Sequence, residues 1–215
     1  MALQLYYITD RQQFAGDRHK QEQRLLAKIA ECAAAGVEYI QLREKDLESR
    51  ALEELAMKAM ATLGGSRTQL LINSRTDVAL ACGAHGVHLP AGDLSASDVR
   101  SIVARAGRGE PVIGVSAHSG AEVAGAEAHG ANFAVFGPVF EKSGSANREG
   151  LEQLRGICHR AEAAQPPMPV WALGGITLEN AQQCIAAGAA GIAGIRLFQQ
   201  NDVQAITRKL RSMQA

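Results

Sequence analysis

The stretch Ala172-Leu173-Gly174-Gly175-Ile176 decides the fold, because a compact apolar run ends there in paired glycines and a periodic segment follows. The run Pro169–Leu173 predicts a buried strand, and Leu178–Ala187, opened by Thr177 or Glu179, predicts a helix. Glycines let the backbone approach a ligand closely, and free N–H groups ahead of a helix suit an anion such as phosphate. Taken alone, the pair favours a plain connecting turn over a phosphate site, and the phosphate interpretation depends on the rest of the chain.

A second strand end with glycine follows, which strengthens the phosphate interpretation. The segment Ala190–Ile195 is another buried apolar run, and Gly194 lies near its end. Two glycine-bearing strand ends in succession are typical of the phosphate site that (β/α)8 barrels build after their seventh and eighth strands. The sequence therefore predicts such a site from Gly174, Gly175 and the turn at Gly194.

The rest of the chain alternates short apolar runs with longer amphipathic ones, which is typical of a parallel sheet. Eight such units favour a closed (β/α)8 TIM barrel, with residues 1–215 as a single domain. The predicted strands are Leu5–Thr9, Tyr39–Arg43, Gln69–Asn73, Gly86–Leu89, Val112–Ser116, Phe133–Gly137, Val170–Gly174 and Gly191–Ile195. The predicted helices are Gln21–Ala35, Ser49–Leu63, Thr76–Cys82, Ala96–Ala106, Gly120–His129, Glu149–Ala164, Leu178–Ala187 and Asp202–Met213.

Composition narrows the class of protein. The 215 residues are 47% hydrophobic but only 4% aromatic, so the core must be mostly aliphatic, as in parallel strands covered by Ala-rich helices. The formal net charge is zero, so nothing global indicates a nucleic-acid or membrane partner. The four cysteines lack metal-site spacing, and neither a signal segment nor a membrane-spanning run is visible. We expect a soluble, cytoplasmic protein with reduced thiols.

The second predicted strand ends in Gln41-Leu42-Arg43-Glu44-Lys45, the sharpest local motif. Side chains alternate along a strand, so Gln41, Arg43 and Lys45 point to one side. A buried amide and guanidinium need an anionic partner, and a diphosphate would satisfy both. The alternative is a surface loop with solvated charges and an internal Arg–Glu pair.

Asn73 and Asp93 follow the third and fourth predicted strands. A carboxylate with amide and water neighbours suits Mg²⁺, which keeps several waters and binds beside substrate phosphates. Asp93 is therefore our candidate metal ligand. The alternative makes it a helix N-cap, with Ser95 or Ser97 as rivals.

Two further strand ends carry candidate chemistry. Ser116 and His118 face the same way after the fifth strand, and a histidine at the barrel mouth can act as an acid or base near neutral pH. In the alternative, Ser119 is an N-cap and His118 a packed loop residue. The small, polar segment Glu141–Asn147 is either a mobile lid or a plain connector.

Several motifs together resemble the thiamine phosphate synthase/TenI family from end to end, and their order is highly specific. They are Tyr7–Arg11, Gln41–Lys45, Ile72-Asn73, Gly86–Leu89, Gly114–His118, Phe136–Phe140 and Ala172–Ile176. The resemblance implies a (β/α)8 barrel. In the synthase branch it implies that hydroxymethylpyrimidine diphosphate loses diphosphate and that the nitrogen of a thiazole phosphate traps the resulting cation, giving thiamine phosphate.

The resemblance also implies residue roles. The expected catalytic residues are Arg43, Lys45, Ser116 and His118. The expected substrate- and phosphate-binding residues are Gln41, Arg43, Lys45, Asn73, Ser116, Lys142, Gly174, Gly175, Gly194, Ile195 and Arg196. Asp93 would bind the cofactor Mg²⁺. The implied partners are the two phosphorylated small molecules, with neither nucleic acid nor membrane, and a homodimer is left open.

Three departures keep other functions open. Ser74 stands where the synthase pattern has Asp. The loop after the sixth strand is shorter and reads Glu141–Ser145 in place of Thr-x-Thr-Lys. Arg196 replaces a small residue at the end of the eighth strand. The alternatives are a TenI-like thiazole tautomerase, with His118 as its acid/base, and a non-catalytic thiazole- or thiamine-phosphate-binding protein.

Overall fold

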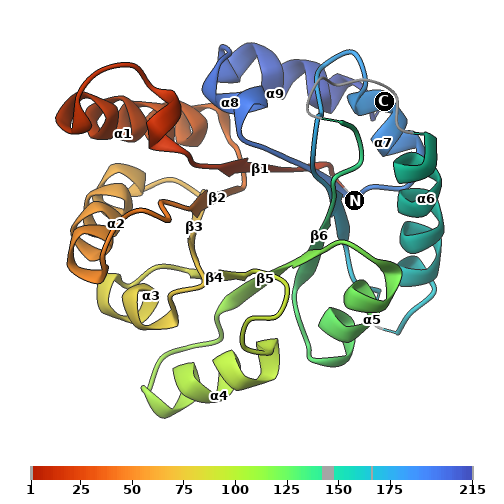
Figure 1. The fold of residues 1–215 in the computed structure, drawn as a ribbon, viewed down its shortest axis with the longest axis horizontal. Coiled ribbons are helices and arrows are strands. Elements are labelled where there is room, and N and C mark those ends of the chain that lie inside the picture. The colour runs from red at the N-terminus through yellow and green to blue at the C-terminus, as the bar shows by residue number, and fades with distance from the viewer. Residues whose placement is uncertain (1, 142–147, 166, 215) are drawn as a thin grey trace.

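The structure, a computed structural model, describes residues 2–141, 148–165 and 167–214. Parallel strands close into a barrel in the order β1 to β8, and helices surround it (Figure 1). The strands are β1 (Gln4–Ile8), β2 (Tyr39–Leu42), β3 (Gln69–Asn73), β4 (Gly86–Leu89), β5 (Val112–Ala117), β6 (Phe133–Phe136), β7 (Val170–Ala172) and β8 (Gly191–Gly194). The predicted (β/α)8 barrel is confirmed.

The α-helices form the outer layer of the barrel. They are α1 (Arg18–Ala35), α2 (Ser49–Leu63), α3 (Thr76–Cys82), α4 (Ala96–Arg105), α5 (Gly120–Ala128), α6 (Arg148–Glu162), α7 (Ala181–Ala186), α8 (Arg196–Gln199) and α9 (Val203–Ser212), with a 3-10 turn η1 at Arg11–Gln13. Each of these α-helices except α8 overlaps a helix that the sequence predicts. None of the described helices is long and apolar enough to cross a lipid bilayer.

Alternate residues of each strand point into the barrel, as the two-residue period of a strand requires. The interior holds a cluster around Tyr6, Phe133 and Trp171, while the other face of the strands packs on the helices. The rings of Phe133 and Trp171 stack with centroids 3.6 Å apart. Aromatic rings thus dominate the inside of the barrel, whereas the layer beneath the helices is mostly aliphatic and includes the rings of Tyr7, Phe136 and Phe198.

Helix α1 begins at Arg18, ahead of the predicted Gln21, because Asp17 caps it. Two further helical differences lie near the predicted phosphate site. Helix α7 begins at Ala181 and not at Leu178, because the Asn180 side chain accepts a hydrogen bond from the backbone N–H of Thr177 and holds a turn there. Helix α8 was not predicted, because four residues are too few to show a periodic pattern. The glycine pair is therefore followed by a turn rather than directly by a helix.

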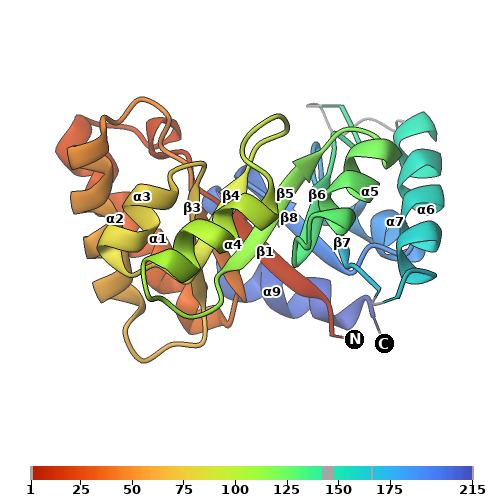
Figure 2. The ribbon, with the colours of Figure 1, turned by 90° about the horizontal axis from the view of Figure 1, so that it is seen from below.

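The strand directions place all the C-terminal strand ends at one rim of the barrel. Residues near both chain ends lie together at the opposite side, where β1 begins (Figure 2). The candidate site residues follow the strand ends, so the fold gathers them at the rim where (β/α)8 enzymes carry their active sites.

Candidate functional site

Three polar side chains at the ends of β2 and β3 point into the barrel mouth. Gln41 is 2% exposed, and Arg43 and Asn73 are half-buried. Among the described residues, none of these three side chains has a hydrogen-bond or ion-pair partner. A buried amide or guanidinium without a partner is costly unless water or a ligand satisfies it. The burial and inward direction of Gln41 agree with the sequence prediction, whereas Lys45 is exposed.

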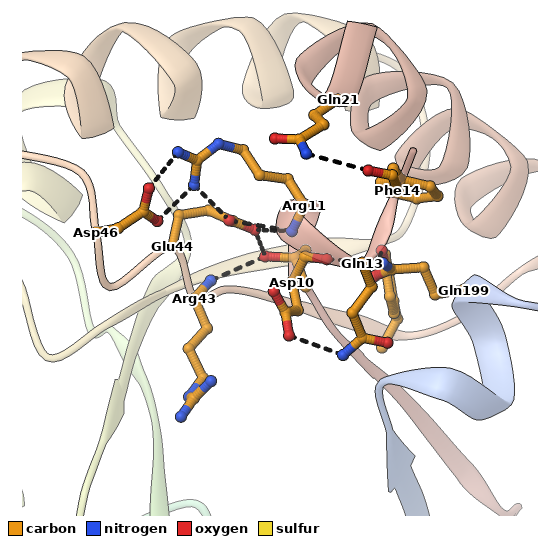
Figure 3. Close-up of polar contacts among 11 residues, drawn as sticks. Asp10, Arg11, Gln13, Phe14, Gln21, Arg43, Glu44, Asp46 and Gln199 are labelled. Atoms are coloured by element: carbon orange, nitrogen blue, oxygen red, sulfur yellow. Dashed lines mark hydrogen bonds and ion pairs between the residues drawn. The ribbon is translucent and has the colours of Figure 1, made fainter. Parts of the chain in front are cut away.

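The glutamate of the same motif pairs with another arginine. Glu44, whose side chain is 1% exposed, contacts the Arg11 guanidinium at 2.9 Å and accepts hydrogen bonds from the Arg11 backbone N–H. Arg11 also forms a bidentate pair with Asp46 (Figure 3). The Arg43 side chain points away from this cluster. The predicted alternative is thus correct for the solvated charge of Lys45, whereas the internal Arg–Glu pair that it also expected is not formed, because Glu44 pairs with Arg11.

The two carboxyl groups that contact Arg11 have pKa values shifted in opposite directions. The Arg11 guanidinium lowers the pKa of Asp46 to about 2 through its hydrogen bonds. Burial raises the pKa of Glu44, although hydrogen bonds from Thr9 and Arg11 oppose that shift. The Thr9 hydroxyl donates to Glu44 at 2.6 Å and accepts from the backbone N–H of Arg43 at 3.0 Å. The cluster therefore fixes the backbone from which Arg43 extends.

A buried histidine connects this side of the mouth to β5. His88 Nε2 lies 2.8 Å from the Ser116 hydroxyl, and Nδ1 lies 3.1 Å from the Tyr6 hydroxyl. Burial lowers the pKa of His88 to about 3, and the nearby positive charge of Arg43 adds to the shift. His88 is therefore neutral near pH 7, and its ring lies between the hydroxyls of Ser116 and Tyr6.

A second group of candidate residues lines a pocket of about 440 Å³ at the ends of β7 and β8. Five predicted phosphate-binding residues border it: Gly174, Gly175, Gly194, Ile195 and Arg196. Helix α8 starts at this point, where (β/α)8 barrels often place a short extra helix beside a phosphate site. The structure thus brings these residues together, but Arg43 and Asn73 are not among the described residues that line this pocket.

The paired glycines have a packing role of their own. Gly174 and Gly175 adopt φ values of 101° and 60°, which side-chain-bearing residues rarely adopt. A Cβ at Gly174 would lie 2.6 Å from the Pro138 Cα, and one at Gly175 would overlap the Glu141 carbonyl oxygen. The close approach that these glycines permit is therefore to the β6–α6 connection, while their backbone borders the pocket.

The candidate metal ligand Asp93 lies in the exposed β4–α4 loop and contacts the Ser74 hydroxyl. Ser95 caps helix α4 with a capping box, so the alternative N-cap role of Asp93 is wrong. Asp93 and Ser116 border one cavity of about 270 Å³. The described residues contain no cluster of three or more metal-ligating His, Cys, Asp or Glu side chains.

The remaining predicted residues are placed as follows. Ser119 caps helix α5, as the alternative for this segment expected. His118 is exposed, its Nδ1 lies 2.6 Å from the Gly137 carbonyl oxygen, and its ring borders a cavity with α5 and α6. Ser116 and His118 therefore border different cavities. Lys142 and most of the predicted lid lie outside the described residues.

Sequence reasoning assigned no role to His88, Tyr6 or Gln199. Gln199 is 6% exposed, accepts from the Tyr7 hydroxyl and donates to the Asp10 carbonyl, which ties α8 to the end of β1. A single histidine in the apolar run Gly86–Leu89, facing inward by alternation, is the one signal that identifies His88 from sequence. The contacts of Tyr6 and Gln199 join distant segments and leave no local pattern.

Comparisons with known proteins agree with this fold and identify the family. A family model described as thiamine monophosphate synthase matches residues 5–198. A putative thiamine-phosphate synthase of Geobacter sulfurreducens is 44% identical over 194 residues, covering 88% of this chain and 83% of that protein. A thiamine-phosphate synthase of Methanoregula boonei is 38% identical, covering 98% and 93%. The solved thiamine phosphate pyrophosphorylase of Pyrococcus furiosus superposes with a TM-score of 0.78 at 30% identity, covering 98% of this chain and 95% of that one. The chain belongs to the thiamine monophosphate synthase (TMP-TENI) family.

Proposed function

We propose that this protein is a transferase that joins hydroxymethylpyrimidine diphosphate to a thiazole phosphate, releasing diphosphate and forming thiamine phosphate. The observation that carries the proposal is the set of unpartnered inward side chains at β2 and β3, Gln41, Arg43 and Asn73. They supply donors for a polyanion at the rim where chemistry is expected. The family relationship supplies the reaction.

The two groups of residues suit the two substrates. Gln41, Arg43 and Asn73, with Lys45 from the rim, would hold the diphosphate and stabilise its charge as it leaves. The β7–β8 pocket, with the backbone of Gly175 and Gly194, would hold the thiazole phosphate. Ser116 lies on the diphosphate side, next to His88, where it would contact the pyrimidine or its diphosphate.

The donor chemistry beside the mouth fits Mg²⁺. Asp93 offers one carboxylate and Ser74 a hydroxyl, both hard oxygen ligands, and Mg²⁺ commonly takes one or two carboxylates together with substrate phosphates. We propose that these two residues would hold the ion. When bound, it would neutralise charge on the departing diphosphate.

Synthesis of thiamine phosphate from the two substrates with Mg²⁺ tests the proposal. We expect Arg43→Ala to lower kcat/KM by about a hundredfold, because one charge-assisted contact is worth up to about 3 kcal/mol. Arg50→Ala removes the same charge from an arginine that is 91% exposed on α2, and it should leave turnover unchanged. Full activity of Arg43→Ala would refute the role of Arg43, and no product from the unaltered protein would refute the proposed function.

A second candidate function is isomerisation of a thiazole carboxylate phosphate, which the geometry of His118 favours. A carbonyl oxygen only accepts, so the Gly137 contact places a proton on Nδ1 and leaves Nε2 of the neutral ring as a base. Isomerisation without Mg²⁺ that His118→Ala abolishes would identify this activity. Tight binding of thiazole phosphate with neither turnover would identify a non-catalytic binding protein.

A further inference from the structure

We propose that Tyr6 and His88 form a buried positioning pair that fixes the Ser116 hydroxyl as a hydrogen-bond donor toward an acceptor atom of the bound substrate. The three side chains form a line from the barrel interior to the mouth. Tyr6 is fully buried, His88 is 2% exposed and Ser116 is half-buried. The identity of the acceptor rests on the proposed function, whereas the direction of the hydrogen bonds does not.

The direction follows from the contacts of Tyr6. Its hydroxyl is 3.1 Å from His88 Nδ1, and this is its one hydrogen-bond partner among the described residues. If Nδ1 carried the proton and donated to Tyr6, the tyrosine hydrogen would be buried without an acceptor. Leaving a buried donor without an acceptor costs about 1–3 kcal/mol, so the Tyr6 hydroxyl donates to His88 Nδ1.

The other ring nitrogen must then carry the proton of the neutral histidine. Both side chains are buried, and among the described residues the His88 ring forms hydrogen bonds only with the hydroxyls of Tyr6 and Ser116 and with no carboxylate, so the charged form of either group is disfavoured. A neutral imidazole has one N–H, and Nδ1 is already an acceptor. His88 therefore donates from Nε2 to the Ser116 oxygen at 2.8 Å.

This direction sets what Ser116 can do. Its oxygen accepts from His88, so its own hydrogen is left to donate, and the described residues give it no acceptor. The pair cannot remove the Ser116 proton, because Nε2 is already protonated. Ser116 is thereby a donor to a diphosphate oxygen or a ring nitrogen, and not a nucleophile activated by His88.

Packing holds the histidine ring in this place. Its centroid lies 5.7 Å from that of Tyr6 and 6.5 Å from that of Phe133. Gly114 makes room for it, since a Cβ there would lie 2.9 Å from His88 Nδ1. The His88 ring is thus held in one orientation. The hydrogen bond from the Tyr6 hydroxyl to Nδ1 therefore determines that Nε2 donates to Ser116.

The tautomer can be measured without any activity. Long-range proton–nitrogen NMR correlations of protein with ¹⁵N-labelled histidine distinguish the two ring forms, and loss of a signal set in His88→Gln assigns it. We expect His88 to show a protonated Nε2 and a bare Nδ1, unchanged between pH 8 and pH 5. A protonated Nδ1, or an imidazolium at pH 6, would overturn the proposal.

A double-mutant cycle tests whether Tyr6 acts through Ser116. Tyr6→Phe should lower kcat/KM for thiamine phosphate synthesis about three- to tenfold, the loss of one hydrogen bond, because the histidine no longer has a fixed tautomer. In a Ser116→Ala background the same change should cost less than about twofold. Equal losses in both backgrounds would mean that Tyr6 has only a structural role, which contradicts the proposal.

Tyr39→Phe is the matched control. Tyr39 packs on Tyr6 with ring centroids 6.2 Å apart but has no hydrogen bond to His88 or Ser116. It should leave kcat/KM unchanged in both backgrounds, and thermal unfolding of each variant separates a loss of folding from a loss of turnover. If the unaltered protein makes no thiamine phosphate, the proposed function fails, and the NMR measurement still decides the direction of the hydrogen bonds.

Discussion

The glycine at position 114 makes room for the buried His88 ring that contacts Ser116. Gly114 faces inward on β5, where the rings of His88 and Phe133 fill the barrel beside it. Close packing leaves no room there for even one methyl group. The candidate site at the rim is therefore packed directly on the barrel core, and we expect a change at Gly114 to reach Ser116 through His88.

We predict that Gly114→Ala lowers the free energy of unfolding by about 1–3 kcal/mol, the usual range for overpacking a core. The added Cβ would lie 2.9 Å from His88 Nδ1 and closer still to the Phe133 ring, so both rings must shift. Urea denaturation monitored by the fluorescence of Trp171 measures the loss. Gly156→Ala is the control, because a Cβ at this position of α6 meets no atom of the described residues within 4 Å.

The control should be stabilised by about 0.5–1 kcal/mol, since alanine is the better helix former. If Gly114→Ala were as stable as the original protein, the barrel interior would be less tightly packed than these distances indicate.

At the scale of elements, the end of β1 is joined to its two neighbours by side chains. Glu44 after β2 binds the backbone and guanidinium of Arg11, and Gln199 of α8 binds the carbonyl of Asp10. Strand β1 pairs with β2 on one side and β8 on the other. The short segment Thr9–Arg11 thus connects the two proposed phosphate subsites, and its ion pairs fix the β2–α2 loop that carries Arg43 and Lys45.

We predict that Glu44→Gln lowers the free energy of unfolding by about 3 kcal/mol, because it removes a buried carboxylate and turns an amide N–H toward Arg11. Asp46→Asn should cost less than about 1 kcal/mol, because the Asp46 side chain is 42% exposed and water screens its charge. Urea denaturation at pH 7 compares the two variants, which disturb the same arginine.

A combined replacement of Arg11 and Glu44 by methionine should recover part of the stability that Glu44→Gln loses, since a buried charge without its partner causes most of the cost. Equal losses for Glu44→Gln and Asp46→Asn would contradict the electrostatic account of this cluster.

The sequence predicts best those helices and strands whose apolar period and flanking turn residues lie close together in the chain. The bounds of β3, β4, α2 and α3 are as predicted, because apolar period and flanking turn residues coincide there. Helix α8 and the late start of α7 were not predicted, since a four-residue helix has no measurable period and the Asn180 turn depends on side-chain hydrogen bonds. Local pattern therefore determines the elements, and contacts between segments adjust their ends.

The same limit applies to the candidate site. Alternation along β2 correctly predicts that Gln41 is buried. It cannot predict that Glu44 pairs with Arg11, or that Tyr6, His88 and Ser116 meet, because those contacts depend on register across strands and on side-chain rotamers. The roles of the site residues in binding or catalysis stay predictions.

At the scale of the whole molecule, the barrel separates two polar groups on one rim. Gln41, Arg43 and Asn73 follow β2 and β3, while Gly174, Gly175 and Arg196 follow β7 and β8. Strand β1 stands between them on the shorter way round the barrel. A reaction with two phosphorylated substrates needs two such subsites, each close enough to the axis for the reacting atoms to meet. This arrangement predicts that substitutions on the two sides affect different substrates.

We predict that Arg196→Ala raises KM for the thiazole phosphate about tenfold, by loss of a charge-assisted contact, and leaves KM for the pyrimidine diphosphate within about twofold. Arg43→Ala should affect the diphosphate substrate and its turnover instead, and the double variant should show additive losses in free energy, as expected of sites without shared partners. Steady-state kinetics with each substrate varied in turn measures both effects, and Arg208→Ala, an exposed change on α9, is the control for charge alone.

A lower KM for the thiazole phosphate in Arg196→Ala would show instead that this arginine obstructs the pocket that it borders. Because the side chain is exposed and borders the pocket from α8, we expect the contact and not the obstruction.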